Sequence, residues 1–345
     1  MTDQPAAKRK RAEGYTHPTM QSEPWLKDGN IVLEAEGHQF RVHRSILANH
    51  SPIFEDMFAM PQPSTTKESE FVEGCPVVKL SDAAADLQYV LKALCHRRCT
   101  LHHFVISLVE FLRVLFTRSY VAVGLTPIPM SVVAAFLRLG KKYDIGILHA
   151  EAVKRLTYEC PSSLEDFDKL EFWSMIEAED GLPIEIVRLA RENGLPSVLP
   201  IALYCCCRCY TAPELLKGVK GKDGNHVALS SEDKETCIVA NQRIIQSQAV
   251  TTFAWMNPSS TSGSLYKYCR SQTSCTSARM ELLCQTFLPL PRSIALDLWE
   301  VEWENGMCDI CVEAAKKSHC EGREEMWNDL PTFFNLSGWT ELTRE

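Results

Sequence analysis

The chain has 345 residues, which is enough for two or three domains that each bury their own core. Its hydrophobic content of 45% and charged content of 23% are typical of soluble globular proteins. A net charge of −8 argues against a general nucleic-acid binder, because such proteins present excess Lys and Arg to phosphates. The 15 cysteines are odd in number, so we expect a reducing compartment and read paired cysteines as metal ligands or buried residues.

Residues 1–22 are polar and show no periodic apolar face, so we predict a disordered basic tail. The run Lys8, Arg9, Lys10 and Arg11 has two readings, a nuclear-import signal or an ordinary solvated tail. No continuous apolar stretch typical of a secretory signal opens the chain. We therefore expect an intracellular protein, in the nucleus or the cytoplasm.

The spacing of apolar residues changes once within the stretch Asn30–Met60. Before Arg44 they alternate with polar residues around a Glu36-Gly37 tip, which predicts a β-hairpin with one buried face. From Arg44 onward they recur every three or four residues, which predicts helices. Ser51-Pro52 has the residue types of an N-cap and a first helical position, so a second helix is expected there.

In this stretch the segments DGNIVL, FRVHRSILA and SPIFEDMF follow one another, and together they resemble the start of a BTB/POZ domain. We expect a loop at Pro61–Gly74, which is rich in Pro, Ser, Thr and Glu. The resemblance continues through a strand at Cys75–Leu80, a capped helix and the segment LRLGKKYDI. It implies an α+β fold, in which a short β-sheet is surrounded by helices, over residues 23–158. It also implies an interaction module that commonly dimerises and recruits other proteins, without catalytic chemistry.

Residues 97–122 interrupt this pattern. They are strongly apolar between Phe104 and Phe116, but Glu110 and Arg113 lie within a run too short for a membrane span, so we expect no membrane insertion. A buried or partner-binding helix is one interpretation of this atypical insertion. Translated intron sequence is the other.

Beyond residue 158 we predict a mainly α-helical remainder, with a helical extension at 159–215 and a C-terminal region at 216–345. Ser163 is expected to cap a helix of the extension. A loop is expected at Gly218–Ser231, with Ser230 capping the next helix. Large aromatic residues near the end are expected to clamp the last helices: Trp299, Trp303, Trp327 and Trp339. The segment DLWEVEWENGMC and the residues after it resemble the end of a large group of fungal BTB proteins.

Two cysteine pairs in the C-terminal region have the chemistry of a zinc site. Cys269 and Cys275 begin and end a predicted polar loop, CRSQTSC, and Cys308 and Cys311 form C-x-x-C before a helix. Four thiolates satisfy a tetrahedral structural zinc ion, which would hold the weakly apolar 257–280 stretch onto the last helices. The alternative is two loop cysteines and two buried helix cysteines. Reserve ligands are Cys284, His319 and Cys320.

A further group, Cys205–Cys207 with Cys209, falls on a predicted helix. Adjacent helical residues point in different directions, so these thiols do not all converge on one ion. We interpret them as small apolar helix residues, with palmitoylation or metal binding as outside alternatives.

We find no catalytic constellation and predict a protein that is not an enzyme. Glycine-rich phosphate loops, G-x-S-x-G and H-E-x-x-H are absent from the sequence, and His102-His103 lie in the insertion. His43 is better explained as the end of a strand than as a base. The leading hypothesis is a self-associating interaction module, expected as a homodimer. The alternatives are a cullin-type ubiquitin ligase adaptor and a nuclear co-regulator that acts through partners, without direct nucleic-acid binding.

Overall fold

The computed structural model describes residues 19–60, 71–95, 126–221, 224–257 and 265–344. Contacts divide the chain into two compact units. Unit 1 comprises residues 1–123 with 138–149, and unit 2 comprises residues 124–137 with 150–345. The basic run at 8–11 and the insertion at 97–122 lie outside the described residues. The domain boundaries expected at 158 and 215 stay predictions.

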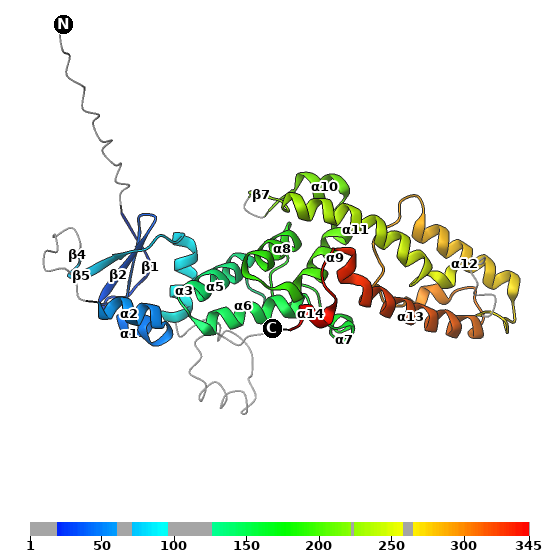
Figure 1. Cartoon of the computed structure of the whole chain (residues 1–345), viewed down its shortest axis with the longest axis horizontal. Coiled ribbons are helices and arrows are strands. Elements are labelled where there is room, and N and C mark those ends of the chain that lie inside the picture. Colours follow the sequence, from blue (N-terminus) through cyan, green and yellow to red (C-terminus); the bar gives the residue numbers. More distant parts are fainter. Residues whose placement is uncertain (1–18, 61–70, 96–125, 222–223, 258–264, 345) are drawn as a thin grey trace, which may run out of the picture. The chain divides into compact units, whose positions relative to one another are not determined.

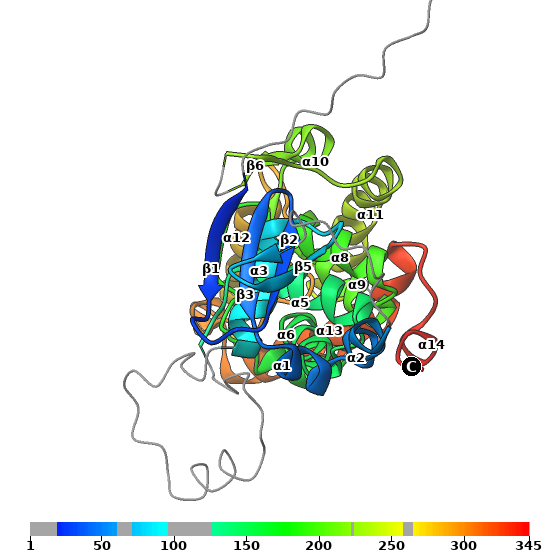
Figure 2. The same cartoon turned by 90° about the vertical axis from the view of Figure 1, so that its left-hand side faces the viewer.

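Unit 1 contains a five-stranded sheet with the strand order β1-β3-β2-β5-β4 (Figure 2). β2 and β3 form the antiparallel hairpin that the alternation predicted, with Leu33 opposite Phe40. β1 runs parallel to β3, and β5 runs parallel to β2 and antiparallel to β4. The strands are β1 (Met20–Trp25), β2 (Ile31–Ala35), β3 (His38–Val42), β4 (Phe71–Val72) and β5 (Cys75–Lys79).

The central position of β2 explains its composition. Ile31, Val32 and Leu33 are each at most 1% exposed, so both faces of this strand are covered. The prediction of one buried face is therefore wrong for β2. Such strands carry continuous apolar runs in place of alternation. At the hairpin tip Glu36 and Gly37 have φ values of 48° and 79°, a left-handed pair that matches the twist of a tight two-residue turn.

Three helices accompany the sheet: α1 (Arg44–His50), α2 (Pro52–Ala59) and α3 (Ala84–Cys95). α3 packs against β1, β2 and β3, and α1 and α2 lie together at one end of the sheet (Figures 1 and 2). The prediction for α2 is confirmed, because Ser51 accepts a hydrogen bond from the Phe54 N–H and Pro52 occupies the first turn.

Three segments predicted without regular structure contain short strands. Residues 20–22 of the expected disordered tail belong to β1, whose polar residues suit an edge strand that pairs only with β3. The expected loop after residue 60 includes β4 at Phe71–Val72. The expected loop Gly218–Ser231 includes a two-stranded ladder, β6 (Val219–Lys220) with β7 (His226–Val227). The two-residue strands leave too few residues for a period to show, and β1 has only one buried residue, Pro24.

Unit 2 is mainly helical, as predicted (Figure 1). Ser163 and Ser230 accept hydrogen bonds from backbone N–H groups at the starts of α7 and α11, so both predicted caps are confirmed. The helices are α5 (Met130–Lys142) and α6 (Gly146–Glu159), which both cross the division between the units, and α7 (Leu164–Asp168), α8 (Leu182–Asn193), α9 (Leu199–Cys209), α10 (Ala212–Lys217), α11 (Ser231–Val250), α12 (Gln272–Phe287), α13 (Asp309–Phe333) and α14 (Trp339–Leu342). Short 3-10 turns are η2 (Pro196–Val198), η3 (Ala254–Met256) and η5 (Val301–Glu304).

Within unit 2, α9 packs against α8 and α11, and α11 packs against α13. The approach of α13 to the chain after α11 is very close at Gly322, where an added Cβ would lie 2.4 Å from the Thr251 carbonyl carbon. Only glycine permits this contact. It brings α13 beside η3 and positions the residues that follow.

The predicted packing role of the tryptophans agrees with the contacts observed. Trp299 and Trp303 pack with Trp255 at centroid separations of 5.0 and 6.0 Å. Trp327 stacks on Trp339 at 4.9 Å, and the Trp339 indole N–H donates to the Trp327 carbonyl at 2.7 Å. These rings therefore join the last helices through buried apolar surface and through a hydrogen bond.

Candidate functional site

The cysteine cluster is defined by Cys269, Cys275, Cys308 and Cys311, whose four Sγ atoms all lie within 4.8 Å of one another. Cys269 ends a turn in which its N–H donates to the Tyr266 carbonyl at 3.0 Å. Cys275 lies in the first turn of α12, Cys308 is the N-cap of α13, and Cys311 lies in the first turn of α13. Residues far apart in the sequence thus bring four thiols together.

Part of the expectation for this segment was wrong. Residues 269–275 were predicted as a polar loop, but α12 starts at Gln272 and carries Cys275 on its buried side. The serines and threonines that indicated a loop are tolerated because they occupy the exposed face of this helix. A helical start gives Cys275 a fixed direction toward the C-x-x-C pair.

Burial differs among the four thiols. Cys275 and Cys311 are 1% and 0% exposed, whereas Cys269 and Cys308 are half-buried. Backbone groups of Arg270 and Cys311 lower the pKa of the Cys308 thiol to about 6. Burial raises the pKa of Cys275 and that of Cys311. The Cys308 N–H also donates to the Cys275 Sγ at 3.2 Å.

The cluster fits a closed thiolate site. Zinc–sulfur bonds of about 2.3 Å place the sulfurs of a tetrahedron about 3.8 Å apart, so the separations here need only a small contraction. Four deprotonated thiols repel one another unless a cation is present. The donor set contains no oxygen ligand, which favours a soft or borderline metal ion such as zinc.

The chain around the cluster is supported by buried polar contacts. The Arg279 guanidinium stacks on the Tyr266 ring, 3.8 Å from its centroid, and donates to the Trp255 carbonyl at 3.3 Å. The Tyr266 hydroxyl donates to the same carbonyl at 2.8 Å. Arg279 is 5% exposed, so these bonds replace water at a buried cation and fix the turn that carries Cys269.

The reserve ligands lie outside the cluster. Cys284 and Cys320 are exposed. His319 is fully buried, with Nδ1 3.1 Å from the Thr252 carbonyl oxygen and Nε2 3.0 Å from that of Asp297. His319 is thus a packing residue that bridges two backbone segments.

In unit 1 a buried polar contact network joins the segment 138–149 to the sheet and helices. Asp82 accepts hydrogen bonds from the Lys142 ammonium at 2.5 Å and from the Tyr143 hydroxyl. The Ser51 hydroxyl donates to the Tyr143 carbonyl at 2.5 Å, and the Tyr143 ring stacks on Phe54 at 4.5 Å. Burial and the Asp82 carboxylate raise the pKa of Tyr143, so its hydroxyl stays a donor.

α2 also presents an apolar outer face. Ile53 and Met57 lie one turn apart on α2, and Met60 follows as its extended C-cap. Ile53 is 40% and Met60 65% exposed, and Met57 is half-buried. The sequence pattern grouped Ile53 and Met57 with Phe54 as recurring apolar residues of a predicted helix. The structure places the core of this helix at Phe54 instead, which is 1% exposed.

The sequence model of the BTB/POZ domain family matches residues 21–94. The chain carries a BTB/POZ domain. No curated protein matches the sequence significantly. The match spans β1 to α3 and confirms the resemblance stated from DGNIVL, FRVHRSILA and SPIFEDMF. BTB/POZ domains are protein–protein interaction modules, and they commonly dimerise.

The remaining candidate residues of the sequence analysis are explained by packing or by local contacts. Cys205–Cys207 are all at most 4% exposed in α9, and the Cys207 thiol donates to the Cys237 carbonyl at 3.4 Å. Burial raises the pKa of Cys206 well above its usual value. Within the BTB domain, His43 starts α1 and its Nε2 lies 3.3 Å from the Asp28 carboxylate. His102-His103 lie outside the described residues.

Sequence reasoning missed the contacts of Asp82 with Tyr143 and Lys142. No local signal links these residues, because about 60 positions separate the partners and each bond depends on the tertiary fold. The exposed row on α2 had a signal, the helical spacing itself. That signal leaves open which side of an amphipathic helix faces the core. In the described part of the chain, no helix combines the length and the apolar character needed to cross a bilayer.

Proposed function

We propose that the chain is a non-catalytic scaffold that self-associates through its BTB/POZ domain and recruits a partner protein through its C-terminal helical region. The observation that carries the proposal is the BTB/POZ match at residues 21–94 on a fold with the corresponding sheet and helices. The exposed apolar face of α2, formed by Ile53, Met57 and Met60, supplies a surface for a second copy, because such faces mark interaction sites.

Light scattering coupled to size exclusion tests the self-association. A micromolar solution of the full chain is expected to show twice the 39.0 kDa chain mass. Ile53→Glu places a carboxylate on the apolar face and is expected to shift the mass to that of one chain. Ala59→Glu is the matched control, since it adds the same charge at an exposed position on another side of α2. A monomeric parent chain, or equal masses for the two variants, contradicts the proposal.

We further propose that the cysteine cluster holds one structural zinc ion. The proximity of the four Sγ atoms supports it, as does the Cys308 N–H that donates to Cys275 Sγ. A four-thiolate site leaves no open position for water or substrate, so its contribution is to folding. Metal analysis of purified protein is expected to give one zinc per chain, and none after Cys275→Ser with Cys311→Ser. A ratio near zero in the parent chain overturns the site.

Two narrower roles are ranked below the scaffold. Some BTB proteins bind cullins, and the basic run at Lys8–Arg11 suggests nuclear import. Neither a cullin contact nor a nuclear location has a supporting observation among the described residues. Retention of purified cullin by the immobilised chain would raise the adaptor role above the scaffold, and nuclear exclusion of the tagged chain would remove the co-regulator role. A fungal origin likewise remains a proposal.

A further inference from the structure

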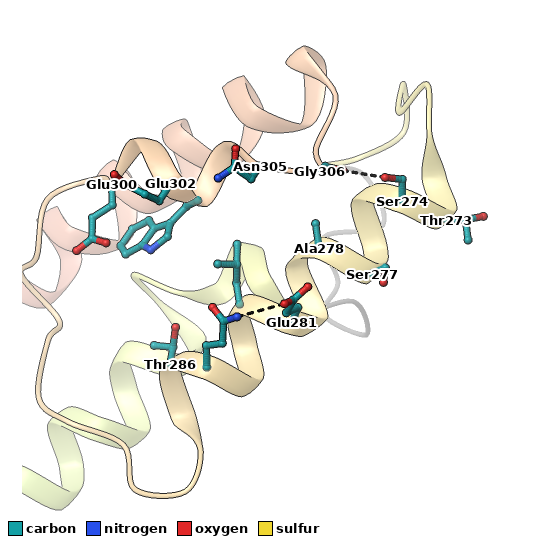
Figure 3. Close-up of a pocket in the computed structure, with 13 residues that line it drawn as sticks. Thr273, Ser274, Ser277, Ala278, Glu281, Thr286, Glu300, Glu302, Asn305 and Gly306 are labelled. Carbon is teal, nitrogen blue, oxygen red and sulfur yellow. Dashed lines mark hydrogen bonds between the residues drawn. The ribbon is translucent and has the colours of Figure 1, made fainter.

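A groove of 1030 Å³ lies between α12 and the segment Glu300–Gly306. On one wall, α12 contributes two adjacent rows of residues at four-residue spacing, from Thr273 to Thr286. Figure 3 shows Glu281 on this helix and Glu300 and Glu302 on the facing wall. Trp303, 9% exposed, and Leu282 supply apolar surface between the walls. The groove therefore combines acidic and neutral polar residues with a small apolar surface.

The two walls are joined at one end. The Ser274 hydroxyl donates to the Gly306 carbonyl at 3.0 Å, as drawn in Figure 3. A Cβ added to Gly306 would lie 3.1 Å from the Ala278 Cβ, so the backbone there is already in close contact with α12. Cys275 directly follows Ser274, and its Sγ accepts the Cys308 N–H. The cysteine cluster thus fixes one end of the groove. The separation of the two walls follows from how α12 and Glu300–Gly306 pack there.

The charge of the groove is unbalanced. Its lining contains three glutamates and no lysine, arginine or histidine. The carboxylates of Glu281, Glu300 and Glu302 are exposed, and no ion pair among the described residues involves them. Nearby cations are engaged elsewhere: Arg279 is buried against Tyr266, and Lys316 pairs with Glu304 at 2.7 Å. A cationic occupant would meet carboxylates from both walls.

The dimensions match a short extended segment. The α12 wall from Thr273 to Thr286 spans about 20 Å at 1.5 Å per helical residue. An extended chain covers that length with about six residues, and its side chains alternate between two faces. One face can reach Trp303 and Leu282 while the other reaches the glutamates.

We propose that the groove between α12 and Glu300–Gly306 binds an extended segment of a partner protein in which lysine or arginine alternates with apolar residues. The inference rests on the proposed recruiting function and assigns its partner chemistry. It does not depend on self-association, because all residues that line the groove belong to one unit of one chain. Failure of the dimer and failure of the groove are therefore separate results.

Fluorescence anisotropy with the full chain tests the proposal. The probe is a labelled octapeptide that alternates arginine and leucine, and the control peptide alternates glutamate and leucine. The first is expected to bind with an affinity that falls as salt rises, because exposed charge pairs are screened. The second is expected not to bind. Equal binding of both peptides, or an affinity unchanged by salt, overturns the proposal.

Variants locate the binding in the groove. The triple change Glu281→Gln, Glu300→Gln and Glu302→Gln is expected to weaken the probe about tenfold or more, since three exposed charge contacts are lost. Its control is Glu232→Gln, Glu235→Gln and Glu324→Gln, which removes the same charge from exposed positions outside the groove. Affinity equal to the control overturns the proposal.

A blocking variant gives an independent readout. Ser277→Arg places a cation at an exposed position inside the groove, where it meets the same carboxylates. It is expected to abolish probe binding while hydrogen exchange in α12 stays unchanged. Light scattering on the triple variant tests the other occupant, a second copy of this chain. Conversion of a dimer to a monomer by the triple change would assign the groove to self-association and overturn the peptide proposal.

Discussion

The BTB/POZ sheet and the cysteine-bearing end of unit 2 are held together by different means. In β2 three consecutive residues, Ile31–Leu33, are at most 1% exposed, and both faces of the strand contribute to a core. α12 has 16 residues, about three times as many as β2, yet only Cys275 and Arg279 of this helix are buried. Apolar area stabilises the sheet by about 25 cal/mol per Å². At the other end α12 adds only partly buried apolar side chains, Leu282, Leu283 and Phe287, to the core around Phe253, Trp255 and Trp303, and directed contacts hold its start.

A core of interdigitated apolar side chains restricts the motion of the sheet. The outer face of α2 is therefore held in a fixed position. The four thiols and Arg279 hold the start of α12 beside its neighbours, so we expect the order of this part of the 265–311 segment to depend on the state of the cysteines.

The largest expected effect is at the cysteine cluster. Cys311→Ser removes one thiolate of the proposed zinc site, and structural zinc sites contribute about 10 kcal/mol or more to folding of their segments. We expect α12 and the first turns of α13 to lose hydrogen-exchange protection, while β2 and β3 keep theirs. Cys284→Ser is the control, because Cys284 lies on the same helix but is exposed. Unchanged protection of α12 in Cys311→Ser would contradict the assigned role of the thiols.

The next effect is in the BTB domain. Phe54→Ala removes a ring that is 1% exposed and stacks on Tyr143 and Phe58, and such truncations cost about 3–5 kcal/mol. We expect β2 and β3 to exchange faster and the zinc content to stay unchanged. Phe71→Ala, at a ring that is 45% exposed, is expected to change stability by less than about 0.5 kcal/mol. Similar losses for the two variants would refute the assigned core.

Much of the fold could be predicted from the sequence, because local patterns and tertiary packing agree there. The hairpin before Arg44, the tip at Glu36-Gly37 and the cap at Ser51 each require only neighbouring residues, and all three are confirmed. β1 and β4 were missed because they are edge strands with little burial. For an edge strand the partner supplies the pairing, so its own sequence need not alternate.

The site was predictable as chemistry but not as geometry. Four cysteines in two pairs identified the cluster, since thiolate chemistry depends on residue type. The helical start that orients Cys275 is hidden by serine and threonine on the exposed face of α12. The groove also had no signature, because Glu281 and Glu300 meet only through the packing of two segments. Such pairings come from tertiary contacts that no local pattern encodes.

A pH dependence is expected in unit 2 from His319. Burial lowers the pKa of His319 below its usual 6.5, so the unfolded chain binds this proton more readily than the folded one. The contribution of His319 to the free energy of unfolding is fully present above pH 6.5. It is lost as pH falls below 6.5, by up to about 1.4 kcal/mol per pH unit. Hydrogen exchange of α13 is expected to accelerate from pH 7 to pH 5 after correction for intrinsic rates. His319→Gln is expected to flatten that slope, and an equally steep slope would exclude His319 as its source.

The smallest expected effect is a difference in free energy of unfolding between variants of two N-cap serines, one in each unit. Ser230 is exposed and caps α11 by accepting the Asp233 N–H at 3.1 Å, so Ser230→Ala is expected to cost about 1 kcal/mol. Ser51 is 1% exposed, caps α2 and also donates to the Tyr143 carbonyl. Ser51→Ala leaves that carbonyl without its donor in a buried place, which adds about 1 kcal/mol or more. Denaturant unfolding followed by hydrogen exchange in each unit measures both costs. Equal costs would show that the Ser51 hydroxyl contributes only as a cap and that the Tyr143 contact adds nothing to the BTB domain.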